Sequence, residues 1–173
     1  MIPLSSAISG ELTWSELPHT RKYELTQVGD VVGALLHPSF WSSDFVAETP
    51  DGRWTFRRSG FYGTGAEIVD SVSEQPIASF KSVWGGRGIL TFADGETFHV
   101  ECKGWWHPVW SVVADGGQLV LRIHTREKTV ELPTAPAVPE SRLPLLLMFA
   151  WYRVLQAEED AASAATVAVF AAC

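Results

Sequence analysis

An apolar run near the C-terminus constrains the fold of this chain more than any other feature. The ten residues from Leu143 to Tyr152 include no charged side chain, and their Leu, Met and Ala content favours a helix over a strand. At 100° per residue, the side chains from Leu145 to Tyr152 cover every face of such a helix with apolar groups. A helix of this kind must be buried on all sides, in a membrane or in a protein core.

The flanks of the run argue against a membrane. A spanning helix requires about 20 apolar residues, whereas Arg153 ends the run and an acidic triplet follows at 158–160. We therefore predict no transmembrane segment and a core helix over about 143–157. Ser141 is expected to cap this helix, and Pro144 is tolerated in its first turn.

The segments on either side of the core helix are less defined. Four prolines in "PTAPAVPESRLP" indicate a linker over 133–142. The C-terminal extension, 158–173, allows two interpretations. The acidic triplet suits the N-terminus of a second helix, whereas "TVAVF" within the extension suits a strand equally well.

The chain before the linker has the pattern of β-hairpins. In "GILTFADGETFHVEC", apolar and polar residues alternate on both sides of Asp94-Gly95. An Asp-Gly pair between alternating runs is typical of a type I′ turn, in which both central residues have positive φ. The same pair recurs at Asp51-Gly52 and at Asp115-Gly116.

The alternating runs predict about twelve strands, spaced as in a sandwich or a barrel. We expect them near residues 12–16, 22–28, 31–37, 44–49, 53–58, 66–71, 76–83, 88–93, 96–103, 109–114, 118–124 and 127–132. Twelve strands that bury one helix on all sides imply an antiparallel barrel closed around that helix. The predicted fold class is therefore mainly β, in a single domain over 1–173.

This pattern resembles the tubby C-terminal-like superfamily, which includes the phospholipid scramblases and the plant LURP-one-related proteins. The segments that carry the resemblance lie between about Val31 and Gln156: "AETPDGRWTFRRSG", "EIVDSVSEQPIASFKS", "GILTFADGETFHVE", "WSVVADGGQLVLRI" and "LPLLLMFAWYRVL". The resemblance implies a twelve-stranded barrel threaded by a hydrophobic helix. It also implies phosphoinositide binding through a basic surface pocket.

The candidate contacts for such a pocket are the basic residues of the central hairpins: Arg53, Arg57, Arg58, Lys81, Arg87 and Lys103. Strand alternation places Arg58 on the same side as Trp54 and Phe56, and Arg57 on the opposite side. Two features associated with scramblases have no counterpart here. The triplet at 158–160 is too short for an alternating set of calcium ligands, and the chain has no cysteine-rich segment for palmitoylation.

Net charge and cysteine usage limit the partners and the compartment. The formal net charge is −7, which argues against a broad affinity for nucleic acid. The two cysteines, Cys102 and Cys173, imply no disulfide framework, so a reducing compartment is expected. The N-terminus has neither the basic start nor the apolar run of a signal peptide, and we predict a cytoplasmic location.

No catalytic or metal-binding motif is present in the sequence. His99 and Glu101 share one strand face. In one interpretation they form half of a metal site or an acid–base pair. In the other, which we favour, they belong to a strand face exposed to solvent. Cys102 is expected on the core side of its strand, where it is inert. We predict neither an enzyme nor a cofactor.

Two His-Pro corners lie among aromatic residues, in "HPSFW" and "WWHPVW". They define a candidate aromatic pocket in which rings would stack a ligand. We favour a second interpretation, in which strands end at proline and the rings pack under the barrel rim. The residues concerned are Phe40, Trp41, Trp105, Trp106, His107 and Trp110.

Three functional hypotheses follow. The first is a non-enzymatic binding module for phospholipid head groups or a membrane surface, with Arg53, Arg57, Arg58 and Lys81 as charge contacts. The second is a protein-interaction or self-association module that uses surface tryptophans and the terminal "TVAVFAAC". The third is a lipocalin-like barrel for an apolar small molecule, which conflicts with a helix that fills the interior.

Overall fold

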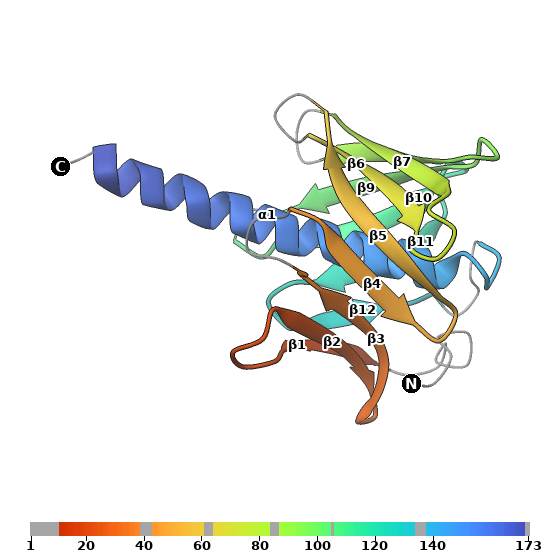
Figure 1. Ribbon diagram of the computed structural model, residues 1–173, viewed down its shortest axis with the longest axis horizontal. Coiled ribbons are helices and arrows are strands. Elements are labelled where there is room, and N and C mark those ends of the chain that lie inside the picture. The colour runs from red at the N-terminus through yellow and green to blue at the C-terminus, as the bar shows by residue number, and fades with distance from the viewer. Residues whose placement is uncertain are drawn as a thin grey trace.

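Twelve antiparallel strands close into a barrel around one helix in the computed structural model (Figure 1). The structure describes residues 11–38, 43–60, 64–83, 87–104, 106–133 and 138–171, with side chains up to residue 164. Each strand pairs with its neighbours in sequence, and β1 pairs with β12 to complete the ring. The predicted fold class is confirmed.

All twelve predicted strands are present, with bounds that differ by at most two residues from those expected. They are β1 Leu12–Glu16, β2 Lys22–Gln27, β3 Asp30–Leu36, β4 Phe45–Thr49, β5 Gly52–Ser59, β6 Gly65–Asp70, β7 Pro76–Val83, β8 Arg87–Phe92, β9 Thr97–Lys103, β10 Val109–Ala114, β11 Leu119–His124 and β12 Thr129–Glu131.

The hairpins are as predicted, but the predicted type I′ turns are wrong. Of Asp94 and Gly95, only the glycine has positive φ, at 91°. The Gly95 amide donates to the Phe92 carbonyl, and the Phe92 amide donates to the Glu96 carbonyl. This three-residue loop places a glycine in the left-handed region after two residues of ordinary backbone. The turn at Asp115 has the same hydrogen bonds, with Gly117 in that position.

The helix α1, Leu143–Ala171, runs through the barrel as the apolar run predicts (Figure 1). Every residue from Leu143 to Tyr152 is buried, because strands surround the helix on all sides. Pro144 lies in the first turn, as expected. Arg142, and not Ser141, takes the capping position: its carbonyl accepts the Leu146 amide, so Ser141 lies in the preceding turn. Part of the predicted linker, 134–137, lies outside the described residues.

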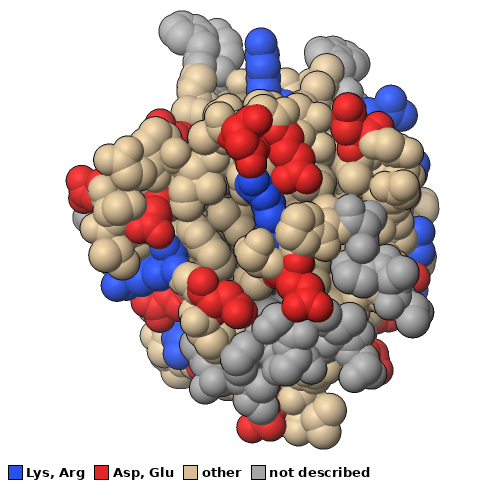
Figure 2. All heavy atoms as spheres, turned by 90° about the vertical axis from the view of Figure 1, so that its right-hand side faces the viewer, with Lys and Arg blue, Asp and Glu red and all other residues tan. Residues whose placement is uncertain are grey.

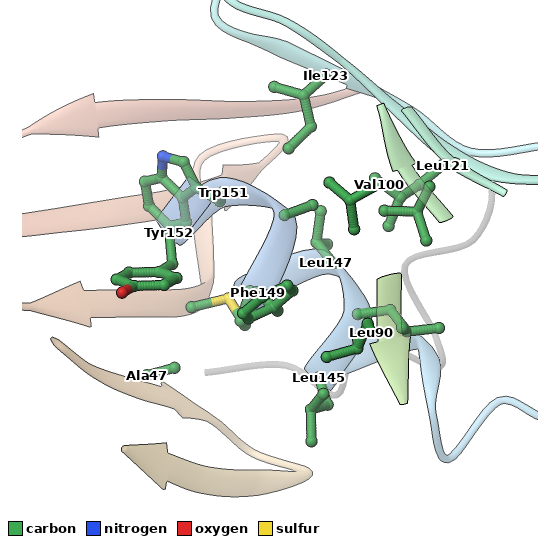
Figure 3. Packing of buried hydrophobic residues seen from close by; sticks show 14 of the residues in the cluster. Ala47, Leu90, Val100, Leu121, Ile123, Leu145, Leu147, Phe149, Trp151 and Tyr152 are labelled. Atoms are coloured by element: carbon green, nitrogen blue, oxygen red, sulfur yellow. The ribbon is translucent and has the colours of Figure 1, made fainter. Parts of the chain in front are cut away.

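Aromatic rings fix the helix against the strands. Tyr152 contacts Phe45 and Phe56 at ring-centroid distances of 5.4 and 5.1 Å, and Phe149 contacts Phe80 at 5.3 Å. Trp151 packs on Trp14 at 6.0 Å. Figure 3 shows Phe149, Trp151 and Tyr152 projecting from α1 in different directions toward the surrounding strands. The described interior is thus filled by side chains of the barrel and the helix.

The segment after the acidic triplet is a continuation of α1, which ends at Ala171. Neither a separate second helix nor a strand forms over 158–171, because Ala, Ser and the acidic residues continue the helix without a break. The residues from Glu158 to Ala164 are exposed and lie outside the barrel. Figure 1 shows this part of α1 projecting well beyond the strands.

Candidate functional site

The two ends of the barrel are distinguished by the helix that passes through it. At the helix-start end, Arg142 forms ion pairs with Asp94 and Glu96 of the β8–β9 turn. At the helix-exit end, Arg58 at the end of β5 pairs with Asp160 of α1. Because neighbouring strands are antiparallel, the connections between strands alternate between these two ends.

The helix-start end is acidic. Each hairpin connection at this end has at least one acidic residue in it or beside it: Asp30, Asp51, Asp70, Glu74, Asp94, Glu96 and Asp115. Figure 2, which faces this end, shows acidic side chains in several groups across the surface. By position along the strands and the helix, Arg53 and Arg142 are the two of the 13 Lys and Arg residues that lie toward it, and both pair with acidic side chains. Figure 2 also shows Lys and Arg side chains at the edges of this view.

The remaining basic residues lie toward the helix-exit end. They occupy its loops, the adjoining strand ends and α1: Arg21, Lys22, Arg57, Arg58, Lys81, Arg87, Lys103, Arg122, Arg126, Lys128 and Arg153. Acidic residues are also present at this end and neutralise most of the charge, as in the pairs of Lys103 with Glu101 and of Arg122 with Glu131. They are Glu16, Glu24, Asp44, Glu101, Glu127, Glu131, Glu158, Glu159 and Asp160. An acidic protein thus has a charge distribution that separates along the barrel axis.

The six predicted basic contacts do not gather at one point. Arg53 lies toward the helix-start end, where its Nε donates to Glu48 Oε1 at 2.9 Å. Arg58 faces inward, as alternation predicts, and Arg57 is exposed on the outer face of the same strand. Lys81 is exposed near the end of β7. Arg57 and Lys81 therefore share both the outer surface and the helix-exit end.

Arg87 and Lys103 lie on β8 and β9 at the same end and share an acidic neighbour. Lys103 Nζ pairs with Glu101 Oε2 at 2.9 Å, and Glu101 is opposite Arg87 in the β8–β9 register. The hydrogen bond from Lys103, with the charges of Lys103 and Arg87, holds the pKa of Glu101 below its ordinary value. This carboxylate therefore stays ionised and offsets part of the local positive charge.

A second basic group lies inside the mouth from which α1 leaves the barrel. Arg58 Nη2 donates to Asp160 Oδ1 at 2.5 Å. Two helical turns before Asp160, the guanidinium of Arg153 covers the Phe80 ring at 4.7 Å from its centroid. Arg153 Nη1 also donates to Gln156 Oε1. We call Arg58, Arg153, Tyr152, Gln156 and Asp160 the mouth cluster.

The mouth cluster has more buried donors than acceptors. Arg58 Nε, Arg153 Nε, Gln156 Nε2 and the Tyr152 hydroxyl are buried without a hydrogen-bond partner in the part of the chain that the structure describes. Burial raises the pKa of Tyr152 to about 12, so its hydroxyl keeps its proton. Burial also lowers the pKa of Arg153, which the positive charge of Arg58 reinforces.

The aromatic candidates do not form one pocket among the described residues. Phe40, Trp41 and Trp105 lie outside these residues. Trp106 is 84% exposed, whereas Trp110 is buried in the core. His107 is exposed, and its Nε2 accepts a hydrogen bond from Arg126 Nη1 at 2.9 Å. Within the other corner, His37 packs edge-on against Phe45 at 4.7 Å.

The candidate catalytic and metal-binding residues do not form a common site either. His99 lies 3.5 Å from Asp115 and Glu101 pairs with Lys103, so the two residues face different partners. Burial raises the pKa of the Cys102 thiol, which makes it a poor nucleophile. Among the described residues, no three His, Cys, Asp or Glu side chains are close enough to hold a metal ion.

One surface groove lies away from both basic groups. It occupies about 210 Å³ on the outer side of β6, β7 and β8. Its lining includes Pro76, Ile77 and Ala93 together with Glu67. No Lys or Arg lines it, so it does not correspond to the predicted basic pocket.

Sequence reasoning missed the role of Arg153, Gln156 and Asp160 in the mouth cluster. The signal was present: Arg153 and Gln156 are polar positions on a helix that is otherwise apolar all round. Asp160 pairs with Arg58, which is 102 residues away in the chain, so sequence spacing alone cannot bring the two together.

A scan against protein-family models found no match for this chain. Searches of curated proteins and of solved structures also returned no match. The resemblance to tubby-like domains therefore remains a prediction. Among the described residues, no helix is long and apolar enough to span a bilayer.

Proposed function

We propose that this protein is a non-enzymatic binding module that docks its helix-exit end on anionic phospholipid surfaces. The observation that carries the proposal is the segregation of charge: only Arg53 and Arg142 of the basic residues lie toward the helix-start end. A basic surface is attracted to anionic lipid by about 1 kcal/mol per Lys or Arg close to the membrane. Segregation allows this attraction in a protein of net charge −7.

The acidic helix-start end contributes to the orientation of the protein. Anionic lipids repel it, so the protein would approach with the helix-exit end first. The exposed outer-face residues Arg57 and Lys81 are the first contacts in this arrangement. Lys103 and Arg87 contribute less, because Glu101 lies beside both. Arg57 has Glu67 opposite it in the β5–β6 register, so its charge is also partly offset.

The test compares two residues of one strand. Arg57 and Arg53 both lie on the outer face of β5, four positions apart, toward opposite ends of the barrel. In sedimentation with vesicles that contain phosphatidylinositol bisphosphate, we expect Arg57→Glu to weaken binding about tenfold or more, because a charge near the surface is reversed. Arg53→Glu should leave binding unchanged. Equal effects of the two substitutions, or equal sedimentation with neutral phosphatidylcholine vesicles, would contradict the proposal.

Self-association is the second candidate, and the projecting part of α1 favours it. Residues from Ala161 to Ala164 are exposed outside the barrel, and a second copy of the chain could cover this surface. Size-exclusion chromatography with light scattering tests this alternative on the full chain and on a chain cut after Gln156. Self-association predicts an oligomer that the cut converts to a monomer, whereas a monomer in both cases removes it. The third hypothesis, an apolar ligand inside the barrel, receives no support from the filled interior.

A further inference from the structure

We propose that the mouth cluster is a binding site for a phosphate-class oxyanion, in which the Asp160 carboxylate occupies the anion's position when no ligand is bound. This inference rests on the proposed function only where the phosphate belongs to a lipid. It concerns the inner mouth of the barrel and not the outer residues Arg57 and Lys81.

The first argument is the surplus of donors. Arg58 Nε, Arg153 Nε and Gln156 Nε2 can only donate hydrogen bonds, and all three are buried without an acceptor among the described residues. The Tyr152 hydroxyl is a fourth donor that is buried without a hydrogen-bond partner among the described residues. Buried donors that remain unpaired are costly, and native proteins seldom retain several together. A ligand with several acceptor oxygens satisfies them.

The second argument is charge. The guanidinium groups of Arg58 and Arg153 influence each other electrostatically, and the carboxylate that the structure shows in contact with the pair is Asp160. Asp44 and Glu159 lie within electrostatic range of Tyr152, but their effects are smaller than those of the two arginines. Guanidinium groups bind phosphate through pairs of charge-assisted hydrogen bonds, so two neighbouring arginines suit an oxyanion.

The third argument is access. The Asp160 side chain is 61% exposed and belongs to the part of α1 outside the barrel. Its carboxylate therefore can leave Arg58 without breaking a buried contact. The Arg58 side chain is itself 28% exposed, so an anion from solvent can reach the guanidinium once Asp160 moves. Asp160 thus acts as a built-in competitor for the site.

The experiment measures the binding of inorganic phosphate to the full chain by isothermal titration calorimetry, at constant ionic strength set with chloride. We expect saturable binding that Arg58→Gln and Arg153→Gln each weaken by about tenfold or more, because each removes a charge-assisted contact. Asp160→Asn should strengthen binding by about fivefold to tenfold, because the competing carboxylate loses its charge. Asp94→Asn, which disturbs an ion pair at the opposite end of the barrel, is the control and should leave phosphate affinity unchanged.

The sign of the Asp160 effect separates a binding site from a structural ion pair. If the pair with Arg58 only holds α1 in place, Asp160→Asn lowers the melting temperature and leaves phosphate affinity unchanged or weaker. That result would overturn the proposal. Since Asp160 is exposed, this variant folds even if Arg58→Gln does not. Heat that depends on ionic strength but not on phosphate would also overturn it.

A second arm of the experiment identifies the source of the phosphate. Binding of both inorganic phosphate and phosphatidylinositol bisphosphate vesicles, each weakened by Arg58→Gln, supports a lipid-borne ligand. Phosphate binding without vesicle binding supports a small free ligand and contradicts the proposed function alone. Vesicle binding that Arg57→Glu weakens, without phosphate binding, overturns the mouth site and leaves the proposed function in place.

Discussion

The two halves of α1 belong to one uninterrupted helix and have opposite environments. From Leu143 to Gln156 the helix is surrounded by strands, and from Glu158 to Ala164 it is exposed to solvent. At 1.5 Å per residue, the part beyond Gln156 extends for about 20 Å outside the barrel. The comparison teaches that the barrel, and not the end of the helix, determines where burial stops.

The sequence changes at the same point as the environment. Arg153 and Gln156 lie where the helix leaves the barrel, and three acidic residues follow at 158–160. The acidic residues 158–160 are thus present where solvent is available, because a charge buried without a partner is very costly. The two halves differ in what a substitution costs, which gives the predictions below.

The largest effect is expected from a charge in the buried half. Leu146 is fully buried in the core, so Leu146→Asp places a carboxylate in the barrel without a partner. The cost is on the order of 5 kcal/mol or more, which is comparable with the whole stability of a domain. We expect loss of soluble, folded protein, measured by expression in the soluble fraction and by circular dichroism.

The matched substitution in the projecting half is Ala164→Asp. Ala164 is exposed, so the new carboxylate stays in water, and a change within about 0.5 kcal/mol is expected. A strong loss of stability in this variant would mean that the projecting half is covered in solution. Native stability of Leu146→Asp would mean that the buried half is not central to the fold.

An intermediate effect on stability is expected at Gly88 of β8, which lies against the Phe80 ring that packs on the buried half of α1. A Cβ added at Gly88 of β8 would lie 2.0 Å from the Phe80 ring, and Phe80 packs on Phe149 of α1. Gly88→Ala should therefore lower the free energy of unfolding by about 1–3 kcal/mol through overpacking, measured by urea denaturation. Gly116→Ala is the control, because the nearest atom to its added Cβ is 3.5 Å away.

The smallest effect is expected at the ion pairs that anchor the start of the buried half. The hydrogen bond from the Glu96 amide, together with Arg142, holds the pKa of Asp94 below its ordinary 3.8. A lowered folded-state pKa contributes stability at pH values above the ordinary one, and this contribution is lost as pH falls through the lowered value. Asp94→Asn should therefore reduce the melting temperature slightly at pH 7.

The pH dependence tests the cause of this effect. The difference in melting temperature between the wild type and Asp94→Asn should shrink as the pH is lowered below 3.8, where the Asp94 carboxyl takes up a proton. Thermal melts followed by circular dichroism between pH 2.5 and pH 7 measure it, in steps of about half a unit. A difference that is independent of pH would show that the charge of Asp94 does not anchor the helix.

Much of the fold could be predicted because its signals are local. Alternation of apolar residues marked all twelve strands, and the inward direction of Arg58 followed from Trp54 and Phe56. The turn type was harder to predict from the sequence. Asp-Gly pairs correctly indicated the hairpins, but in Asp94-Gly95 only the glycine has positive φ. The choice of turn depends on the register of the flanking strands, which pairing across the sheet determines.

The candidate site was less predictable than the fold. The basic residues could be named, but their neutralising partners come from other strands, as Glu48 does for Arg53 and Asp160 for Arg58. The continuation of α1 beyond the barrel was also open, because "TVAVF" carries no local signal that excludes a strand. Contacts between residues far apart in the chain decide these points.

The sequence by itself determined that a helix with apolar side chains on every face must be packed against other residues on every face, since apolar surface exposed to water costs free energy. The twelve strands with alternating apolar residues are the part of the chain that can bury such a helix. The tertiary structure decided which residues lie at the same end of the barrel. Antiparallel pairing sends alternate connections to opposite ends, and this separates the acidic turns from the basic residues and brings Arg58, Arg153 and Asp160 together at the mouth.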